Sequence, residues 1–335
     1  MGSSASCFGA GASTCSQPAA CAGEGGSGVG LPADCSSEPP QARSSAHASS
    51  AGNDAMRRGR QDMGGDDRQR PMAVSPRIRR YDQVLLDLDG CLWLGDEAVA
   101  DAPAAVTALR DAGKALAFLT NDVRHTPEEL VRKLWRLGFQ AALSEVVTAG
   151  SALQFLLSGR DGGAAFVVGS QALVDHVAEA GLRIVNRTEF ASRADVVVVG
   201  GHDRFDFEEL KIATQAVMRG AELVAATRAP TFPMPDGPWP GTGAVLAAIE
   251  TAAGRTASLV AGKPEQPMYE TARDRLGEGR CLAVGDRLDS DVAGARRAGM
   301  DSALVLTGGT SRMQAEAADP RPTHVADSLA ALVLG

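Results

Sequence analysis

The chain has 335 residues, of which 44% are hydrophobic and 22% are charged, and its formal net charge is -8 at neutral pH. This composition is typical of a globular protein, and the length allows two domains. The acidic balance argues against nucleic acid as a partner, because nucleic-acid binding needs basic surface that displaces counterions. The sequence has neither a membrane-length apolar run nor the apolar core of a signal peptide, so we expect a soluble cytoplasmic protein with no membrane partner.

The N-terminal stretch, residues 1–79, is rich in Ala, Ser, Gly and Pro and has almost no large apolar side chains. A segment of this composition cannot bury enough apolar surface to offset the conformational entropy lost on folding. We therefore expect a disordered, low-complexity extension. Whether residues 1–71 belong to the native protein stays open, because later methionines (Met56, Met63 and Met72) are alternative starts.

From Tyr81 onward, short apolar runs alternate with helical patterns. The runs lie at 84–88, 115–119, 164–168, 195–199, 222–226, 258–261, 281–284 and 302–306. This rhythm predicts an α/β fold with a doubly wound parallel sheet covered by helices. One helix start is explicit, since Thr126 can cap the helix, Pro127 can open it and Glu129 can complete a capping box.

Polar side chains follow four of these expected strands. The four sets are Asp87 and Asp89; Thr120 and Asn121; Lys263; and Asp286, Asp289 and Asp291. In open α/β sheets, ligands bind outside the carboxyl ends of the strands. If the strands are parallel neighbours, one crevice would hold carboxylates, a hydroxyl and an ammonium, which together suit phosphoryl transfer.

Three of the carboxylates, Asp87, Asp286 and Asp291, offer hard oxygen ligands of the kind that Mg²⁺ prefers. Calcium loops and phosphate-binding loops fit the pattern less well. An EF-hand register through Asp289 and Asp291 puts Met300 where the bidentate glutamate belongs, and no Gly-Lys-Ser/Thr sequence is present.

Four residues of the set, Asp87 among them, can be given catalytic roles. Asp87 can attack phosphorus to form an aspartyl-phosphate, while Asp89 can protonate the leaving oxygen and then activate water. Thr120 and Lys263 can hold the phosphoryl oxygens. Taken singly, Lys263 would read as a solvated lysine and Thr120 as part of an ordinary turn.

In these motifs and in their order, residues 80–335 resemble the haloacid dehalogenase (HAD) superfamily. Carried over residue by residue, the resemblance implies Asp87 as nucleophile, Asp89 as acid/base whose backbone carbonyl also ligates Mg²⁺, Thr120 and Lys263 as the second and third motifs, and Asp286 with Asp291 as the acidic fourth motif. It also implies a Rossmann-like core.

Two further segments, 197–205 and 239–243, resemble the NagD/p-nitrophenylphosphatase branch, subclass IIA. That branch has an inserted α/β cap domain of the C2 type. We therefore expect a core made of residues 80–160 and 258–335, a cap at residues 161–257, and an association into homodimers through the cap.

The chain departs from the pattern of this branch at two places. The branch usually has Thr-Asn-Asn in the second motif, whereas Asn121 is here followed by Asp122. In the cap, the usual Thr-Asn-x-Asp is replaced by Thr-Arg-Ala-Pro, which brings in Arg228. We regard Asn121, Asp122 and Arg228 as candidate substrate-binding residues.

Four other side chains have two readings each. His125 and His202 could contact substrate or lie in surface loops, and Trp93 and Trp239 could line a pocket or simply pack.

The function expected from these residues is that of a Mg²⁺-dependent phosphatase, which hydrolyses a small phosphorylated metabolite. A phosphotransferase using the same intermediate is one alternative. A non-catalytic regulatory module that binds a small molecule on the same fold is another. The second alternative is disfavoured by the intact set of Asp87, Asp89, Thr120, Lys263 and Asp286.

Overall fold

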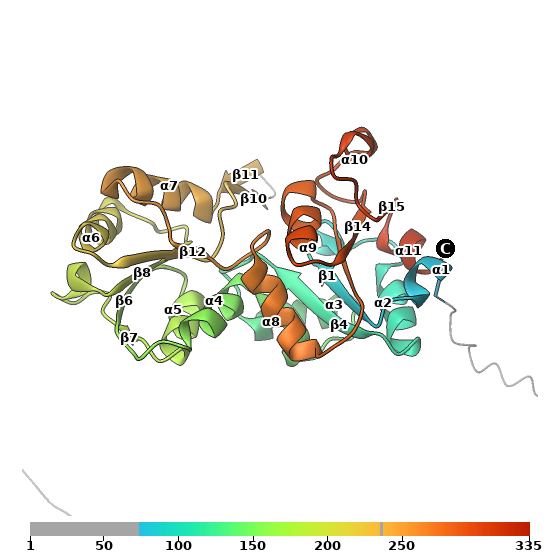
Figure 1. Cartoon of the computed structure of the whole chain (residues 1–335), viewed down its shortest axis with the longest axis horizontal. Helices are drawn as coiled ribbons and strands as arrows, with labels where there is room; N and C mark the ends of the chain where they lie inside the picture. Colours follow the sequence, from blue (N-terminus) through green and yellow to red (C-terminus); the bar gives the residue numbers. More distant parts are fainter. Residues whose placement is uncertain (1–73, 235–236) are drawn as a thin grey trace, which may run out of the picture. The chain divides into compact units, whose positions relative to one another are not determined.

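The computed structural model describes residues 74–234 and 237–335 (Figure 1). The disorder expected for residues 1–73 falls outside the described part of the chain. Residues 74–79, by contrast, are folded. A short helix, α1 (Pro76–Arg79), buries Ile78 completely, and the Ser75 amide donates to the Val333 carbonyl at 2.7 Å.

The folded part therefore begins earlier than the predicted residue 80. The cause is a contact between the first and last elements of the described chain, since α1 packs on α11 (Leu329–Val333) and the Ser75 hydroxyl donates to the Leu332 carbonyl at 2.7 Å. A composition window around residue 78 is dominated by arginine and does not reveal this distant partner.

The first sheet has six parallel strands in the order β15-β14-β13-β1-β4-β5. The strands are β1 (Gln83–Asp87), β4 (Ala115–Thr120), β5 (Val146–Thr148), β13 (Cys281–Gly285), β14 (Asp301–Val305) and β15 (His324–Ala326). The strand order reverses at β1, because the chain first adds strands on one side of β1 and later adds strands on the other. This reversal is where an open α/β sheet places its ligand.

Helices cover both faces of this sheet, as its alternating side chains require. Val84 and Leu86 pack with α2 (Ala102–Asp111), α3 (Pro127–Arg136) and α11, whereas Leu85 faces the opposite cluster. That cluster contains α4 (Ala149–Leu157), α8 (Gln266–Leu276) and α9 (Ala293–Arg297). The predicted doubly wound parallel sheet is confirmed.

The second sheet has five parallel strands in the order β12-β9-β8-β6-β7. They are β6 (Ala164–Gly169), β7 (Arg183–Ile184), β8 (Val196–Gly201), β9 (Glu222–Ala225) and β12 (Leu259–Val260). This part of the chain also holds α5 (Gln171–Glu179), α6 (Phe207–Met218), α7 (Thr242–Ala253), and the hairpin of β10 (Thr231–Met234) and β11 (Gly237–Pro240). The sheet lies between β5 and β13 in the sequence, where the cap was expected.

The shorter elements complete the architecture. They are β2 (Trp93–Leu94), β3 (Glu97–Ala98), α10 (Arg312–Ala317), the 3-10 turns Leu143–Glu145 and Ala191–Arg193, and a π-helical turn at Leu288–Val292. Within the described residues, no helix is both long enough and apolar enough to span a membrane.

The helix start at Thr126 has the predicted geometry. The Glu129 amide donates to Thr126 Oγ1 at 3.3 Å, and the Thr126 amide donates to Glu129 Oε2 at 2.9 Å, which completes the capping box. The helix that follows holds the segment after β4 in place, and this segment contributes to the site described next.

Candidate active site

Two carboxylates stand at the end of β1. Asp87 is the last residue of the strand and is buried, whereas Asp89 lies beyond it and is exposed. The indole N–H of Trp93 donates to Asp89 Oδ1 at 2.8 Å, so this buried tryptophan orients the carboxylate rather than lining a pocket. Gly90 turns the chain with a φ of 85°, and its amide donates to the Trp93 carbonyl at 2.8 Å.

The neighbouring strand β4 delivers Thr120, since the register pairs Asp87 with Leu119. Thr120 is buried, and its Oγ1 accepts from the Asp122 amide at 3.1 Å. The hydroxyl proton of Thr120 is left for another acceptor. This arrangement fits a donor to a phosphoryl oxygen, the role predicted for Thr120.

The side chain of Asn121 joins the second motif to the third. Its Nδ2 donates to the Lys263 carbonyl at 2.9 Å, and its Oδ1 accepts from the Lys263 amide at 2.8 Å. The predicted substrate contact of Asn121 would therefore compete with two backbone hydrogen bonds. In this geometry the Asn121 side chain holds the Lys263 backbone beside the end of β4.

Lys263 is buried between two carboxylates. Its Nζ donates to Asp87 and, at 2.7 Å, to Asp291 Oδ1. Burial alone would lower the pKa of Lys263, but the charges of Asp291 and Asp87 outweigh burial and raise that pKa well above its ordinary value. The lysine is consequently a fixed cation in the middle of the acidic group.

The fourth strand end carries Asp286, directly after β13. Its Oδ2 accepts from the Gly309 amide at 2.5 Å, and its Oδ1 is buried with no hydrogen-bond partner in the described structure. The two backbone positions beside this carboxylate are glycines, because a Cβ on Gly90 would lie 2.5 Å from Asp286 Oδ2 and a Cβ on Gly308 would also collide with it. The sequence analysis missed the Gly308–Gly309 contribution, although these glycines follow the predicted strand at 302–306 in the same way as the four motifs follow theirs.

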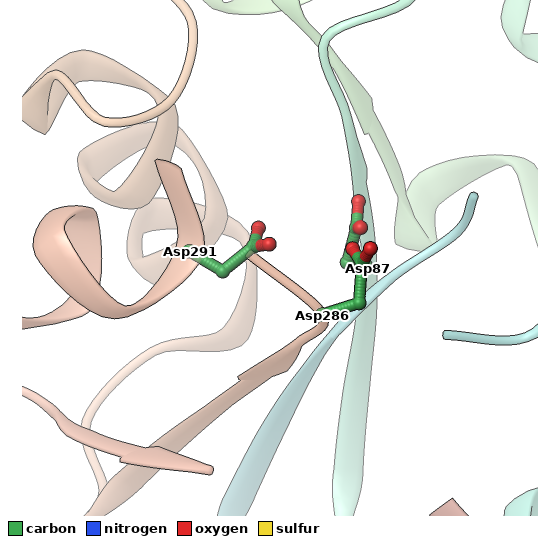
Figure 2. Close-up of side chains that lie close together, drawn as sticks. All are labelled: Asp87, Asp286 and Asp291. Atoms are coloured by element: carbon green, nitrogen blue, oxygen red, sulfur yellow. The ribbon is translucent and has the colours of Figure 1, made fainter. Parts of the chain in front are cut away.

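Asp87, Asp286 and Asp291 converge on one point (Figure 2). One oxygen from each lies within 4.8 Å of the others, and all three residues are buried. Three converging carboxylates with one orphaned buried oxygen fit a hard divalent cation, and Mg²⁺ in particular is held by few protein carboxylates plus other oxygens. The donor set therefore fits the predicted metal.

The electrostatics support the same conclusion. Burial raises the pKa of Asp87 well above its ordinary value, the charges of Asp291 and Asp286 raise it further, and Lys263 opposes them. Burial and then Asp291 also raise the pKa of Asp286. A divalent cation removes this mutual repulsion, so cation binding should be accompanied by proton release.

The negative charge introduced by Asp122 is paired locally. The His125 Nδ1 lies 2.6 Å from Asp122 Oδ2, and the Arg124 amide donates to Asp122 Oδ1 at 2.7 Å. Burial would raise the pKa of Asp122, but its contacts with His125 and Arg124 lower it, and the pKa of His125 is correspondingly raised by Asp122. The carboxylate of Asp122 is therefore paired with His125, a residue for which the sequence alone left two readings.

Arg228 is also engaged. Its guanidinium donates to both carboxylate oxygens of Glu250 on α7, at 2.8 and 3.2 Å. A substrate anion would have to compete with this carboxylate. The substrate contact proposed for Arg228 stays a prediction.

The fold and this acidic site define a class before any relative is considered: enzymes with a doubly wound α/β core whose acidic site suits phosphoryl chemistry with a divalent cation. Comparison with known families agrees. A haloacid dehalogenase-like hydrolase model matches residues 84–183, and a HAD-hydrolase-like model matches residues 260–332.

Individual relatives extend this match over most of the chain. The D-glycerol 3-phosphate phosphatase of Mycobacterium tuberculosis is 37% identical over 258 residues, which cover 76% of this chain and 71% of the relative. Human chronophin is 37% identical over 291 residues, covering 80% of this chain and 98% of chronophin.

Solved structures agree with the sequence relatives. The glycerol phosphate phosphatase of Mycobacterium tuberculosis in complex with magnesium superposes with a TM-score of 0.71 at 37% identity, over 76% of this chain and 77% of that one. The p-nitrophenyl phosphatase of Archaeoglobus fulgidus gives a TM-score of 0.70 at 28% identity, over 75% and 98% of the two chains. The protein belongs to the haloacid dehalogenase superfamily, in its NagD-like subclass IIA, and the predicted family is confirmed.

Proposed function

We propose that the protein is a Mg²⁺-dependent phosphatase, which hydrolyses phosphate monoesters of small metabolites through an aspartyl-phosphate on Asp87. The observation that carries the proposal is the buried contact of Asp87 with Lys263, inside a group whose other members are Asp286 and Asp291. Relatives named as D-glycerol 3-phosphate phosphatase and sugar-phosphatase support a small phosphorylated substrate.

In this mechanism a carboxylate oxygen of Asp87 attacks phosphorus, the Asp87–phosphorus bond forms, and the bond to the leaving oxygen breaks. Lys263 opposes the burial and neighbouring charges that raise the pKa of Asp87 and, with the Thr120 hydroxyl, stabilises the charge on the transferring group. Mg²⁺, bound by Asp87, Asp286, Asp291 and the Asp89 backbone carbonyl, would neutralise charge on the phosphoryl oxygens.

Asp89 completes the proton transfers. Its exposed carboxyl group gives a proton to the leaving oxygen, and it then takes a proton from the water that attacks the aspartyl-phosphate. The hydrogen bond from Trp93 holds Asp89 at a fixed position for both steps. Attack by this water breaks the Asp87–phosphorus bond, which regenerates the Asp87 carboxylate and releases inorganic phosphate, so each cycle consumes one phosphate ester and one water.

The test is phosphate release from a panel that includes glycerol 3-phosphate, sugar phosphates and p-nitrophenyl phosphate, with Mg²⁺ and with EDTA. Asp87→Asn should abolish turnover, because an amide does not attack phosphorus. Asp289→Asn is the matched control, since Asp289 is exposed and pairs with Arg287 in the same turn. Release by the Asp87→Asn variant at the wild-type rate, or full activity in EDTA, would refute the proposal.

The domain boundaries and the association of the protein are part of the same proposal. We infer that the second sheet and its helices form a cap that supplies substrate contacts, and that the protein forms a homodimer through this cap. Light scattering on the protein and on variants of the cap surface tests the dimer.

A further inference from the structure

The hydroxyl group of Tyr269 contacts the metal-binding turn. Tyr269 lies on α8 and is 1% exposed, and its Oη is 3.2 Å from the Asp291 carbonyl and 3.3 Å from the Ser290 carbonyl. The phenol donates its single proton to this pair of carbonyls. Both belong to the π-helical turn Leu288–Val292, which carries Asp291 into the site.

The turn is built to receive this ring. Gly294 follows the π-helical turn, and a Cβ on Gly294 would collide with the Tyr269 hydroxyl and lie 2.5 Å from Cε2 of the ring. On its other side, the Asp291 side chain lies against Gly285, where a Cβ would collide with its carboxylate. Asp291 is therefore confined between the end of β13 and the tyrosine.

Packing alone does not account for the hydroxyl. Tyr269 belongs to an apolar cluster with Leu85, Ala117 and Met268, in which a phenylalanine ring would fill the same volume. Burying a hydroxyl among apolar side chains is unfavourable unless the hydroxyl is hydrogen-bonded.

We propose that Tyr269 is a positioning residue for the cation: its hydroxyl fixes the π-helical turn so that the Asp291 carboxylate stays within reach of Asp87 and Asp286. The inference rests on the metal site of the proposed function. Tyr269 lies outside the four motifs but contributes to the affinity for the cation, because hydrogen-bond partners of metal ligands orient those ligands.

The test measures cation binding directly, without substrate. Mn²⁺ is the probe, because its free and bound forms are distinguished by electron paramagnetic resonance. We expect Tyr269→Phe to weaken Mn²⁺ binding by about tenfold, the lower end of what removing such partners costs. The Mg²⁺ concentration for half-maximal phosphate release should rise by the same factor, while kcat at saturating Mg²⁺ should change by less than about threefold.

Tyr81→Phe is the matched control. Tyr81 is the other tyrosine of the chain; it is fully buried, and its hydroxyl donates to Asp301 Oδ2 at 2.8 Å, outside the acidic group. This variant should lose stability but keep its Mn²⁺ affinity. Equal weakening in both tyrosine variants would mean that Tyr269 acts only through general stability, and unchanged affinity in Tyr269→Phe would overturn the inference.

A second variant approaches the same contact from the other side. Gly294→Ala should weaken Mn²⁺ binding at least as much, because its methyl group must push the ring off the turn. Gly159→Ala is the control, since an added Cβ there meets nothing within 4 Å. Wild-type protein that binds Mn²⁺ yet hydrolyses no phosphate ester would refute the proposed function alone, whereas wild-type protein that binds no Mn²⁺ would overturn both.

Discussion

Replacing Asn121 by alanine should damage both the stability of the fold and the position of the catalytic lysine. The substitution removes two hydrogen bonds to the Lys263 backbone and leaves an amide and a carbonyl to find other partners. Each such bond contributes about 1 kcal/mol, so we expect the free energy of unfolding to fall by about 2 kcal/mol. For a folded unit of this size the midpoint of thermal unfolding should drop by about 4–8 °C.

Activity should fall by more than this loss of stability explains. A displacement of about 1 Å in a catalytic group can cost about a hundredfold in rate, and the Lys263 ammonium is fixed through the backbone that Asn121 holds. The assay is kcat and KM for p-nitrophenyl phosphate at a temperature at which the variant is fully folded. We expect the change to appear in kcat.

The chain offers a matched control in Asn186. Its side chain also makes a pair of backbone hydrogen bonds, accepting from the Val167 amide at 2.9 Å and donating to the Val167 carbonyl at 2.7 Å. Asn186→Ala should lose comparable stability and keep kcat. The reasoning is refuted if Asn121→Ala keeps full stability and raises only KM, because Asn121 would then contact substrate and not the backbone of Lys263.

Three further predictions use contacts outside the catalytic lysine. The pKa of His125 is raised by Asp122, so the stabilisation of the folded state by this pair should be full below about pH 6.5 and should disappear as the pH rises through the raised pKa. Urea unfolding of His125→Gln and of the wild type at several pH values measures this stabilisation. A difference between the two proteins that does not depend on pH would contradict the prediction. Ile78→Ala should cost about 2–4 kcal/mol because Ile78 is fully buried, whereas variants of the exposed arginines in α1 should change little; a negligible cost in chemical unfolding would place α1 outside the folded unit. Trp93→Phe should lower kcat for glycerol 3-phosphate more than for p-nitrophenyl phosphate, because a good leaving group needs less help from the acid that Trp93 holds, Asp89; equal losses would argue against that role.

Much of the site could be predicted because its parts are local in sequence. Three of the motifs directly follow strands of the first sheet, β1, β4 and β13, and a parallel sheet brings the ends of neighbouring strands together. Lys263 instead follows β12 of the second sheet, and the Asn121 side chain holds its backbone beside the end of β4. Asp87, Asp286 and Asp291 needed no more than this to be placed near one another. The family resemblance adds roles to positions that the pattern had already selected.

What escaped the sequence depends on pairings between side chains and distant backbone. Asn121 looked like a substrate contact because its partner, the Lys263 backbone, lies far along the chain. His125 was left with two readings since its contact with Asp122 depends on the course of one loop. Tyr269 was not singled out in the sequence, because only the folded structure brings its hydroxyl to the carbonyls of Ser290 and Asp291.

The position of β1 in the first sheet has a consequence for how the protein is made. On one side β1 pairs with β4, which follows soon in the sequence, but on its other side it pairs with β13, which is synthesised only after the whole second sheet. Until β13 leaves the ribosome, the central strand keeps an open edge of apolar residues, which is a template for aggregation. A nascent chain can complete the second sheet first, while the carboxylates from β1 and β13 meet only after β13 has been synthesised. Chains that end before β13 should therefore be prone to aggregate and should lack the cation site altogether.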